Sequence, residues 1–224
     1  YEMARNSLRE RINWETTYLS NPGGLDQAAP FPKHPPLHFR EGPENLSQTA
    51  DPDSEIHTAI NPLDYNNLIV AATKWTPGII GEDLSFPIYH TNDFGQSWQL
   101  SDYNGVNALP EFAVVVGGGD PVLSFDAEGT AYFSCLLVVF DVLEFSFEIV
   151  LQWAVSTDGG ATWKQQPTPI DSGTLIDLED PQSRVVDKQW MAADESTGCS
   201  FQNTLYSAYA EINLRDTTYN LLVK

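Results

Sequence analysis

The sequence is poor in basic residues and in cysteine. It carries 11 Lys and Arg against 31 Asp and Glu over 224 residues, which gives a formal charge of −20. A surface this acidic repels phosphate backbones and anionic lipid, so it argues against a nucleic-acid partner. Two cysteines, Cys135 and Cys199, are too few for a disulfide scaffold. One bridge between them and two separate thiols both stay open.

Long apolar runs are also missing. No stretch of about 18 apolar residues occurs, so the sequence predicts no membrane span. The most apolar run, Cys135–Phe140, is typical of a buried strand. No apolar segment of the signal-peptide kind follows Tyr1–Arg5. Hydrophobic residues still make up 42% of the chain, a composition typical of a globular protein.

Residues 1–50 differ in pattern from the rest of the chain. Asn6–Leu19 is rich in helix formers with Asn6 as an N-cap, and Asn21–Gly24 ends the helix. Five prolines follow between Pro30 and Pro43, which favour an extended segment. We therefore expect an N-terminal helix and proline-rich arm over 1–50, followed by a main domain over 51–224.

From about residue 54, short β-rich runs alternate with turns, and three blocks align. Asn61, Asp126 and Asp194 follow equivalent strands at offsets of 65 and 68 positions. Each block supplies three or four strands, the content of one propeller blade. The pattern predicts an all-β fold, a partial β-propeller of about three four-stranded blades. The expected blades are about 54–103, 120–167 and 187–224, the last incomplete. Gly117–Gly119 is expected as a flexible turn before the second blade.

Two segments fit the pattern S/T-x-D-x-G-x-S/T-W, and their Asp residues are again 65 positions apart. The Asp carboxylate can accept hydrogen bonds from turn N–H groups and from the Ser/Thr hydroxyl. The Gly permits a positive φ, and the Trp can pack the turn between blades. The motif residues are Thr91, Asp93, Gly95, Ser97 and Trp98 in the first segment, and Ser156, Asp158, Gly160, Thr162 and Trp163 in the second.

This motif resembles the Asp-box (BNR repeat) of sialidase-like β-propellers, as in secreted bacterial proteins labelled exo-α-sialidase or BNR-repeat glycosyl hydrolase. The resemblance covers about residues 51–224. It implies that the two motifs are structural, and that the protein is bacterial and secreted or at the cell surface. Because a propeller normally needs 4–8 blades, we expect further blades from the same protein or from another chain.

Catalysis is the point on which the sequence departs from the family. The resemblance implies an arginine triad, a Tyr nucleophile with a Glu partner, an Asp acid/base, and an Arg-Ile-Pro motif before the first Asp-box. No Arg-Ile-Pro occurs, and Arg40 in Phe39–Gly42 is its nearest counterpart. The candidate catalytic residues are Arg40, Arg184, Asp120 and Asp187. Whether the protein is an enzyme stays open.

Acidic residues gather near the ends of the innermost expected strands. Asp120, Asp126, Asp187 and Asp194 are candidate Ca²⁺ ligands, and Ca²⁺ is the only cofactor that the sequence suggests. The same residues and Glu55 could equally cap turns or form an acid–base pair. The four histidines lack the spacing of a zinc site.

Two functions follow from these observations. The first is a non-catalytic binding or scaffold propeller that recognises a glycan or a protein partner. The alternative is a sialidase-like exo-glycoside hydrolase whose remaining catalytic residues lie beyond residue 224. The missing Arg-Ile-Pro favours the first.

Overall fold

The computed structural model describes residues 45–77, 82–103, 113–175, 183–216 and 218–224. Asn45–Lys224 group into one compact unit. All secondary-structure elements of this part are β-strands, so the fold is all-β. The helix expected over Asn6–Leu19 and the proline-rich arm lie outside the described residues. None of the described segments forms a helix long and apolar enough to cross a membrane.

The first sheet is an antiparallel meander with the order β1–β2–β4–β5, and β3 pairs with the far part of β2. Its strands are β1 (Asp53–Ile60), β2 (Leu68–Pro77), β3 (Glu82–Ser85), β4 (Ile88–Thr91) and β5 (Gln99–Leu100). In β2, Ile69, Ala71 and Thr73 are all almost fully buried. Alternate residues of a strand share a face, so this face of β2 is the one that packs.

The second sheet repeats this meander with longer strands, in the order β6–β7–β8–β10, and β9 pairs with another part of β8. Its strands are β6 (Ala113–Phe125), β7 (Ala131–Asp141), β8 (Ser146–Ser156), β9 (Lys164–Gln165) and β10 (Asp171–Leu175). The sheet extends beyond the expected blade limits of 120 and 167 at both ends.

Gly117–Gly119 corrects one expectation, because these glycines lie inside β6 and do not form a turn. A side chain at Gly118 would collide with the backbone carbonyl of Leu136 on β7, and one at Gly119 with the carboxylate of Glu55 on β1. The glycines therefore let β6 approach its neighbours on two sides.

The third sheet has three strands in the order β11–β12–β13. They are β11 (Arg184–Ala193), β12 (Leu205–Asn213) and β13 (Thr218–Val223). The outermost strand, β13, exposes Tyr219, Leu221 and Val223 on one face.

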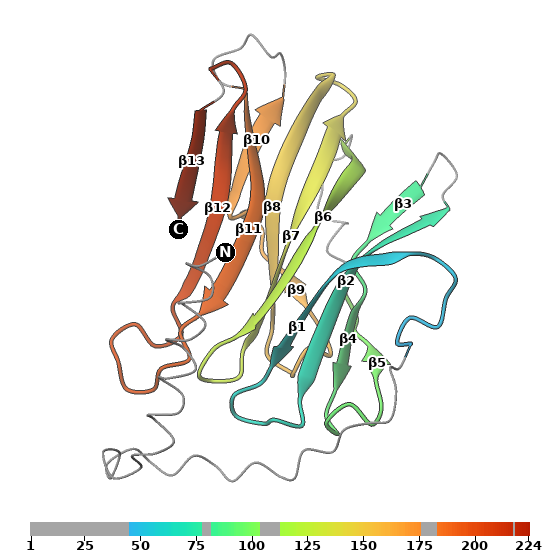
Figure 1. Cartoon of the computed structure of the whole chain (residues 1–224), viewed down its shortest axis with the longest axis vertical. Coiled ribbons are helices and arrows are strands. Elements are labelled where there is room, and N and C mark those ends of the chain that lie inside the picture. Colours follow the sequence, from blue (N-terminus) through green and yellow to red (C-terminus); the bar gives the residue numbers. More distant parts are fainter. Residues whose placement is uncertain (1–44, 78–81, 104–112, 176–182, 217) are drawn as a thin grey trace, which may run out of the picture. The chain divides into compact units, whose positions relative to one another are not determined.

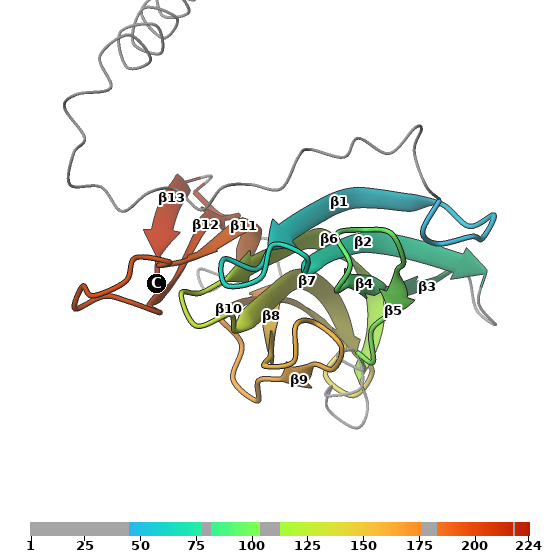
Figure 2. The same ribbon diagram turned by 90° about the horizontal axis from the view of Figure 1, so that it is seen from below.

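The first strands of the three sheets lie side by side, so the sheets follow one another like the blades of a propeller (Figures 1 and 2). Side chains of β1 accept backbone N–H groups of β6, at Asp120 and Leu123. Between β6 and β11, Gln189 donates to the Asp120 carbonyl and Ala193 N–H donates to Ser124. The prediction of an all-β partial propeller is confirmed.

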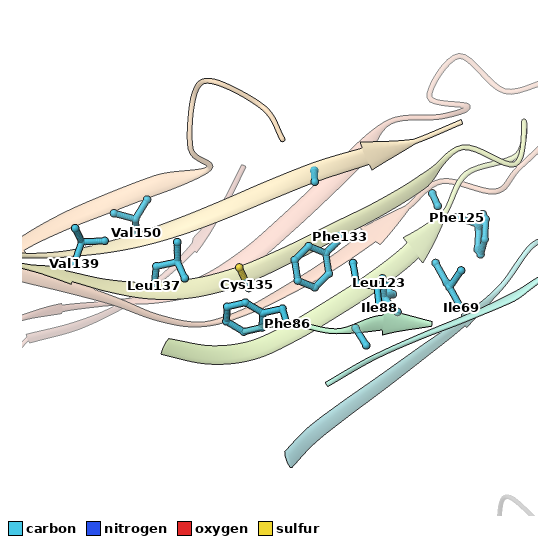
Figure 3. Close-up of a cluster of buried hydrophobic side chains, with 13 residues drawn as sticks. Ile69, Phe86, Ile88, Leu123, Phe125, Phe133, Cys135, Leu137, Val139 and Val150 are labelled. Atoms are coloured by element: carbon cyan, nitrogen blue, oxygen red, sulfur yellow. The ribbon is translucent and has the colours of Figure 1, made fainter. Parts of the chain in front are cut away.

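Two apolar cores hold the sheets together. The first joins sheets one and two around Phe133, Phe125, Ile69 and Ile88, which are all at most 1% exposed (Figure 3). The second joins sheets two and three, where Leu151 of β8 is clustered with Val186 and others. Burying each large apolar side chain stabilises the fold by about 1.5–3 kcal/mol, so these cores fix the order of the sheets.

Candidate functional site

The two S/T-x-D-x-G-x-S/T-W segments adopt the same hydrogen-bonded turn. In the first, the Thr91 hydroxyl and the Ser97 N–H donate to Asp93 Oδ1 at 2.7 and 2.8 Å, and the Ser97 hydroxyl donates to Oδ2 at 2.6 Å. In the second, Ser156, the Thr162 N–H and the Thr162 hydroxyl bind Asp158 at 2.7, 2.9 and 2.6 Å. Both aspartates are thus fully occupied in holding their own turns.

The electrostatics of the turns follow from these bonds. Hydrogen bonds from Ser97 and then Thr91 lower the pKa of Asp93 to about 2. Partial burial alone would raise the pKa of Asp158, but the hydrogen bonds from Thr162 and Ser156 outweigh it and hold that pKa below its ordinary value. Both carboxylates are therefore ionised at neutral pH and are poor proton donors for catalysis.

The second turn also docks on the first sheet. Asn67 Nδ2 donates to the Gly159 carbonyl at 2.8 Å, and Asp102 N–H donates to the Ala161 carbonyl at 2.9 Å. The Trp163 indole donates to the Gly160 carbonyl at 3.0 Å and meets the Phe133 ring edge-on, with centroids 6.1 Å apart. This turn is therefore a structural joint between two blades.

A different feature recurs on the innermost strands of all three sheets. Each strand carries a β-bulge, and at each bulge a charged residue has a positive φ: Glu55 at 51°, Asp120 at 52° and Lys188 at 53°. The three positions are spaced by 65 and 68 residues, the period of the blades. Non-glycine residues seldom adopt this conformation, and such strain commonly accompanies functional sites.

These three bulge residues are linked to one another. Glu55 Oε2 accepts the Thr73 hydroxyl at 3.0 Å and the backbone N–H of Asp120 at 2.9 Å. The Lys188 ammonium donates to Asp120 Oδ1. That hydrogen bond is the main cause of the raised pKa of Lys188, and the charges of Asp120 and Glu55 add to it. A polar chain therefore runs across all three blades.

Two aromatic rings lie beside this chain. His57 Nδ1 accepts the Leu123 N–H at 3.1 Å, so the ring is neutral with its proton on Nε2. Burial lowers the pKa of His57, in agreement with that state. The Trp190 ring meets His57 edge-on at 5.0 Å, and Trp190 is 60% exposed. We call Glu55, His57, Asp120, Lys188 and Trp190 the inner-strand site.

The sequence candidates are distributed as follows. Asp120 belongs to the inner-strand site, whereas Asp187 only accepts the N–H of Lys188. Asp126 accepts the backbone N–H groups of Glu128 and Thr130 and the Tyr132 hydroxyl. Asp194 accepts the Ser196 N–H and the Cys199 thiol. Asp194 thus binds groups of its own turn, and Asp126 binds its own turn and the following strand β7.

Arg184 lies at the joint between sheets two and three. Its guanidinium binds Asp171 at 2.6 Å and Glu211 at 2.5 Å, and it also donates to the Ser172 carbonyl. Partial burial would raise the pKa of Asp171, but the hydrogen bonds from Arg184 and then Tyr209 lower it overall. Arg184 is thus committed to an ion-pair network, and Arg40 lies outside the described residues.

No cluster of three or more His, Cys, Asp or Glu that could hold a metal ion occurs among the residues that the structure describes. Cys135 is buried and Cys199 is exposed, and both are free thiols.

The sequence places Lys188 with Arg184 at the start of the third blade, where both could line a central pocket, but His57, Trp190 and the link of Lys188 to Asp120 and Glu55 were missed. The signal was present, because the 65- and 68-residue offsets that align Asn61, Asp126 and Asp194 also align Glu55 with Asp120 and Lys188. The residue types differ from blade to blade, so a search for one recurring residue passes over them.

The fold and the turns define an all-β chain of the propeller type. No family model matches it, and no curated protein does. Among solved structures, it is similar to an α-L-arabinanase of Penicillium chrysogenum complexed with arabinobiose, at 17% identity and a TM-score of 0.48, over 76% of this chain and 45% of that one. A protein of unknown function from Dyadobacter fermentans is similar at 14% identity and a TM-score of 0.37, over 76% and 54% of the two chains. The chain spans about half the length of these structures, and likenesses this distant carry no argument about activity.

Proposed function

We propose that this protein is a non-catalytic binding propeller that recognises a glycan at the inner-strand site. The observation that carries the proposal is the exposed Trp190 ring beside the linked charges of Glu55, Asp120 and Lys188. An aromatic face next to a few fixed polar groups suits a sugar ring, which has one apolar face and a rim of hydroxyls.

The charge of the site favours a neutral glycan. Glu55 and Asp120 outnumber the single ammonium of Lys188, Lys188 is already paired with Asp120, and the carboxylate of Asp187 adjoins the site. A carboxylate-bearing sugar would meet net negative charge there, and the whole chain is acidic as well. This argues against a sialic acid ligand.

The same residues support binding over hydrolysis. Of the arginines in the described part of the chain, Arg184 is held by Asp171 and Glu211, and Arg215 lies at the turn between β12 and β13. Neither contributes to the inner-strand site. Glu55 accepts two donors and Asp120 accepts Lys188, so both carboxylates are held by partners within the protein. A glycosidase instead needs a carboxyl group that is free to reach the glycosidic oxygen. A secreted or cell-surface location and membership of the Asp-box family are part of this proposal.

The test is affinity electrophoresis of the whole chain against neutral polysaccharides. Trp190→Ala should weaken retention by at least about fivefold, since an aromatic contact of this kind contributes on the order of 1 kcal/mol beyond the buried area. Phe201→Ala is the matched control, because Phe201 is 61% exposed and lies in a separate turn. Equal retention of the two variants would contradict the proposal.

A second assay addresses the alternative. The same polysaccharides are incubated with the protein, and new reducing ends are counted. Release that disappears in Asp120→Asn would show hydrolysis and would replace the binding function by an enzymatic one.

A further inference from the structure

A cavity of about 500 Å³ lies in the first sheet, apart from the inner-strand site. Its lining comes from strands β2, β3 and β4, from the β3–β4 connection, and from Leu100, Ser101, Tyr103, Ser47 and Thr49. Thr73 of β2 binds Glu55 of the inner-strand site, and Lys74 is the next residue along the strand. Because successive side chains of a strand point to opposite faces, Lys74 points away from the inner-strand site. The cavity and the inner-strand site share no residue, and its volume is within the range of small-molecule sites.

One wall of this cavity is polar and charged. Lys74 is only 9% exposed, and its ammonium donates to the Thr49 hydroxyl. Asp53 Oδ1 and Asp51 Oδ2 lie 3.8 and 4.0 Å from the same nitrogen. Asp53 Oδ1 is buried without a hydrogen-bond partner. Asp51 and Asp53 are not among the residues that line the cavity, so they act on a ligand through their charge and through Lys74.

A second polar group is available beside them. The hydroxyl of Tyr89, a lining residue on β4, makes no hydrogen bond within the described part of the chain. Partial burial, and then the charge of Asp53, raise the pKa of Tyr89, so it remains a protonated donor at neutral pH. Ser85 adds a further hydroxyl to the lining.

The other wall is apolar. Phe86 and Ile88 are 4% and 1% exposed, and Leu84 packs against the same core cluster. Tyr103 meets the ring of Phe133 edge-on at 5.1 Å. The wall is therefore anchored in the first core and is pre-formed, which reduces the cost of ordering it around a ligand.

We propose that this cavity is a second binding site, which takes a neutral ring compound bearing hydroxyl groups, such as a single sugar residue or a cyclic polyol. The apolar wall covers the ring, while Tyr89, Ser85 and the Lys74 ammonium bind its hydroxyls. Asp51 and Asp53 lie behind the lining, within 4.0 Å of the Lys74 ammonium, and outnumber it, so the charge beside this wall is net negative and disfavours an anionic ligand. This proposal does not depend on the function proposed for the inner-strand site.

The test is saturation-transfer NMR with methyl β-D-glucoside and with glucuronate. The whole chain carries Trp190→Ala, so that the inner-strand site contributes little. Methyl glucoside should bind, and Tyr89→Phe should weaken it about fivefold, the effect of one lost hydrogen bond. Tyr206→Phe is the matched control, because Tyr206 is 42% exposed on a different sheet. Glucuronate should bind more weakly than the glucoside. Asp51→Asn removes one negative charge, so it should reduce the difference in affinity between the two ligands.

Three outcomes would overturn the proposal. They are no saturation transfer to methyl glucoside, an equal effect of Tyr89→Phe and Tyr206→Phe, and glucuronate binding as tight as that of the glucoside. Tyr89→Phe keeps the aromatic ring, so an unchanged thermal midpoint should accompany its weaker binding.

Discussion

Replacement of Gly160 by alanine tests whether the second turn is a joint between blades. Gly160 has a φ of +91°, where an L-residue is strained, and a Cβ there would lie well inside 3.0 Å of Ile69 Cγ2 on β2. Ile69 is fully buried and belongs to the first core, so it cannot move aside freely. The variant therefore combines backbone strain with overpacking.

Gly95 in the first turn is the matched control. Its φ is +80°, but a Cβ there would meet the Trp98 indole at 3.5 Å, an ordinary contact. Strain at a positive φ costs about 1–2 kcal/mol, and that is the expected loss for Gly95→Ala. Overpacking adds about 1–3 kcal/mol, so Gly160→Ala should lose about 2–5 kcal/mol of the free energy of unfolding.

Urea unfolding of both variants measures the difference. The midpoint of Gly160→Ala should fall further than that of Gly95→Ala at an unchanged slope. Ile69→Ala removes the colliding methyl group, so combining it with Gly160→Ala should cost less than the sum of the two single changes. Two results would refute the interpretation of the second turn as a joint between blades. One is an equal loss of unfolding free energy in Gly160→Ala and Gly95→Ala, and the other is strict additivity of Gly160→Ala with Ile69→Ala.

Three further predictions concern single side chains. Since the pKa of Asp93 falls from 3.8 to about 2 on folding, its stabilisation is complete above 3.8 and is lost as the pH falls toward 2; the urea midpoints of the wild type and Asp93→Asn should converge over that window, and a constant gap would contradict the assignment. Arg184→Gln should lower the free energy of unfolding by about 1–3 kcal/mol because it strips two carboxylates of their partner, whereas Arg215→Gln should change it by less than about 0.5 kcal/mol in the same experiment. Burial raises the pKa of the Cys135 thiol, so a thiol reagent should titrate Cys199 alone in the native chain and both cysteines in urea; no reactive thiol in urea would indicate a disulfide instead.

The repeated units could be predicted from the sequence because the interactions that form them are local. The bonds of the two turns join residues two and four positions apart, as Thr91 to Asp93 and Asp93 to Ser97, so the motif alone carries their geometry. Alternating β-rich runs at a constant offset gave the number and order of the sheets. The turn expected at Gly117–Gly119 was wrong, because this segment has the composition of a turn but lies within β6.

The inner-strand site could not be read in the same way. Its hydrogen bonds join residues 65 or more positions apart, as Glu55 to Asp120 and Asp120 to Lys188. A charged residue in a strand pattern indicates solvent exposure, and nothing local predicts the bulge and positive φ that aim Glu55 at the next blade.

The sequence by itself determined the all-β class, the three repeated units and the two self-contained turns, because short-range hydrogen bonds and side-chain periodicity act within a few residues. Only the tertiary structure decided which charges meet. Asp120 contacts Glu55 and Lys188 only because the three sheets pack side by side. Lys74 likewise lines the cavity only in the folded protein. The physical reason is that side-chain ion pairs and hydrogen bonds act over a few ångströms in space, and the distance along the chain does not report them.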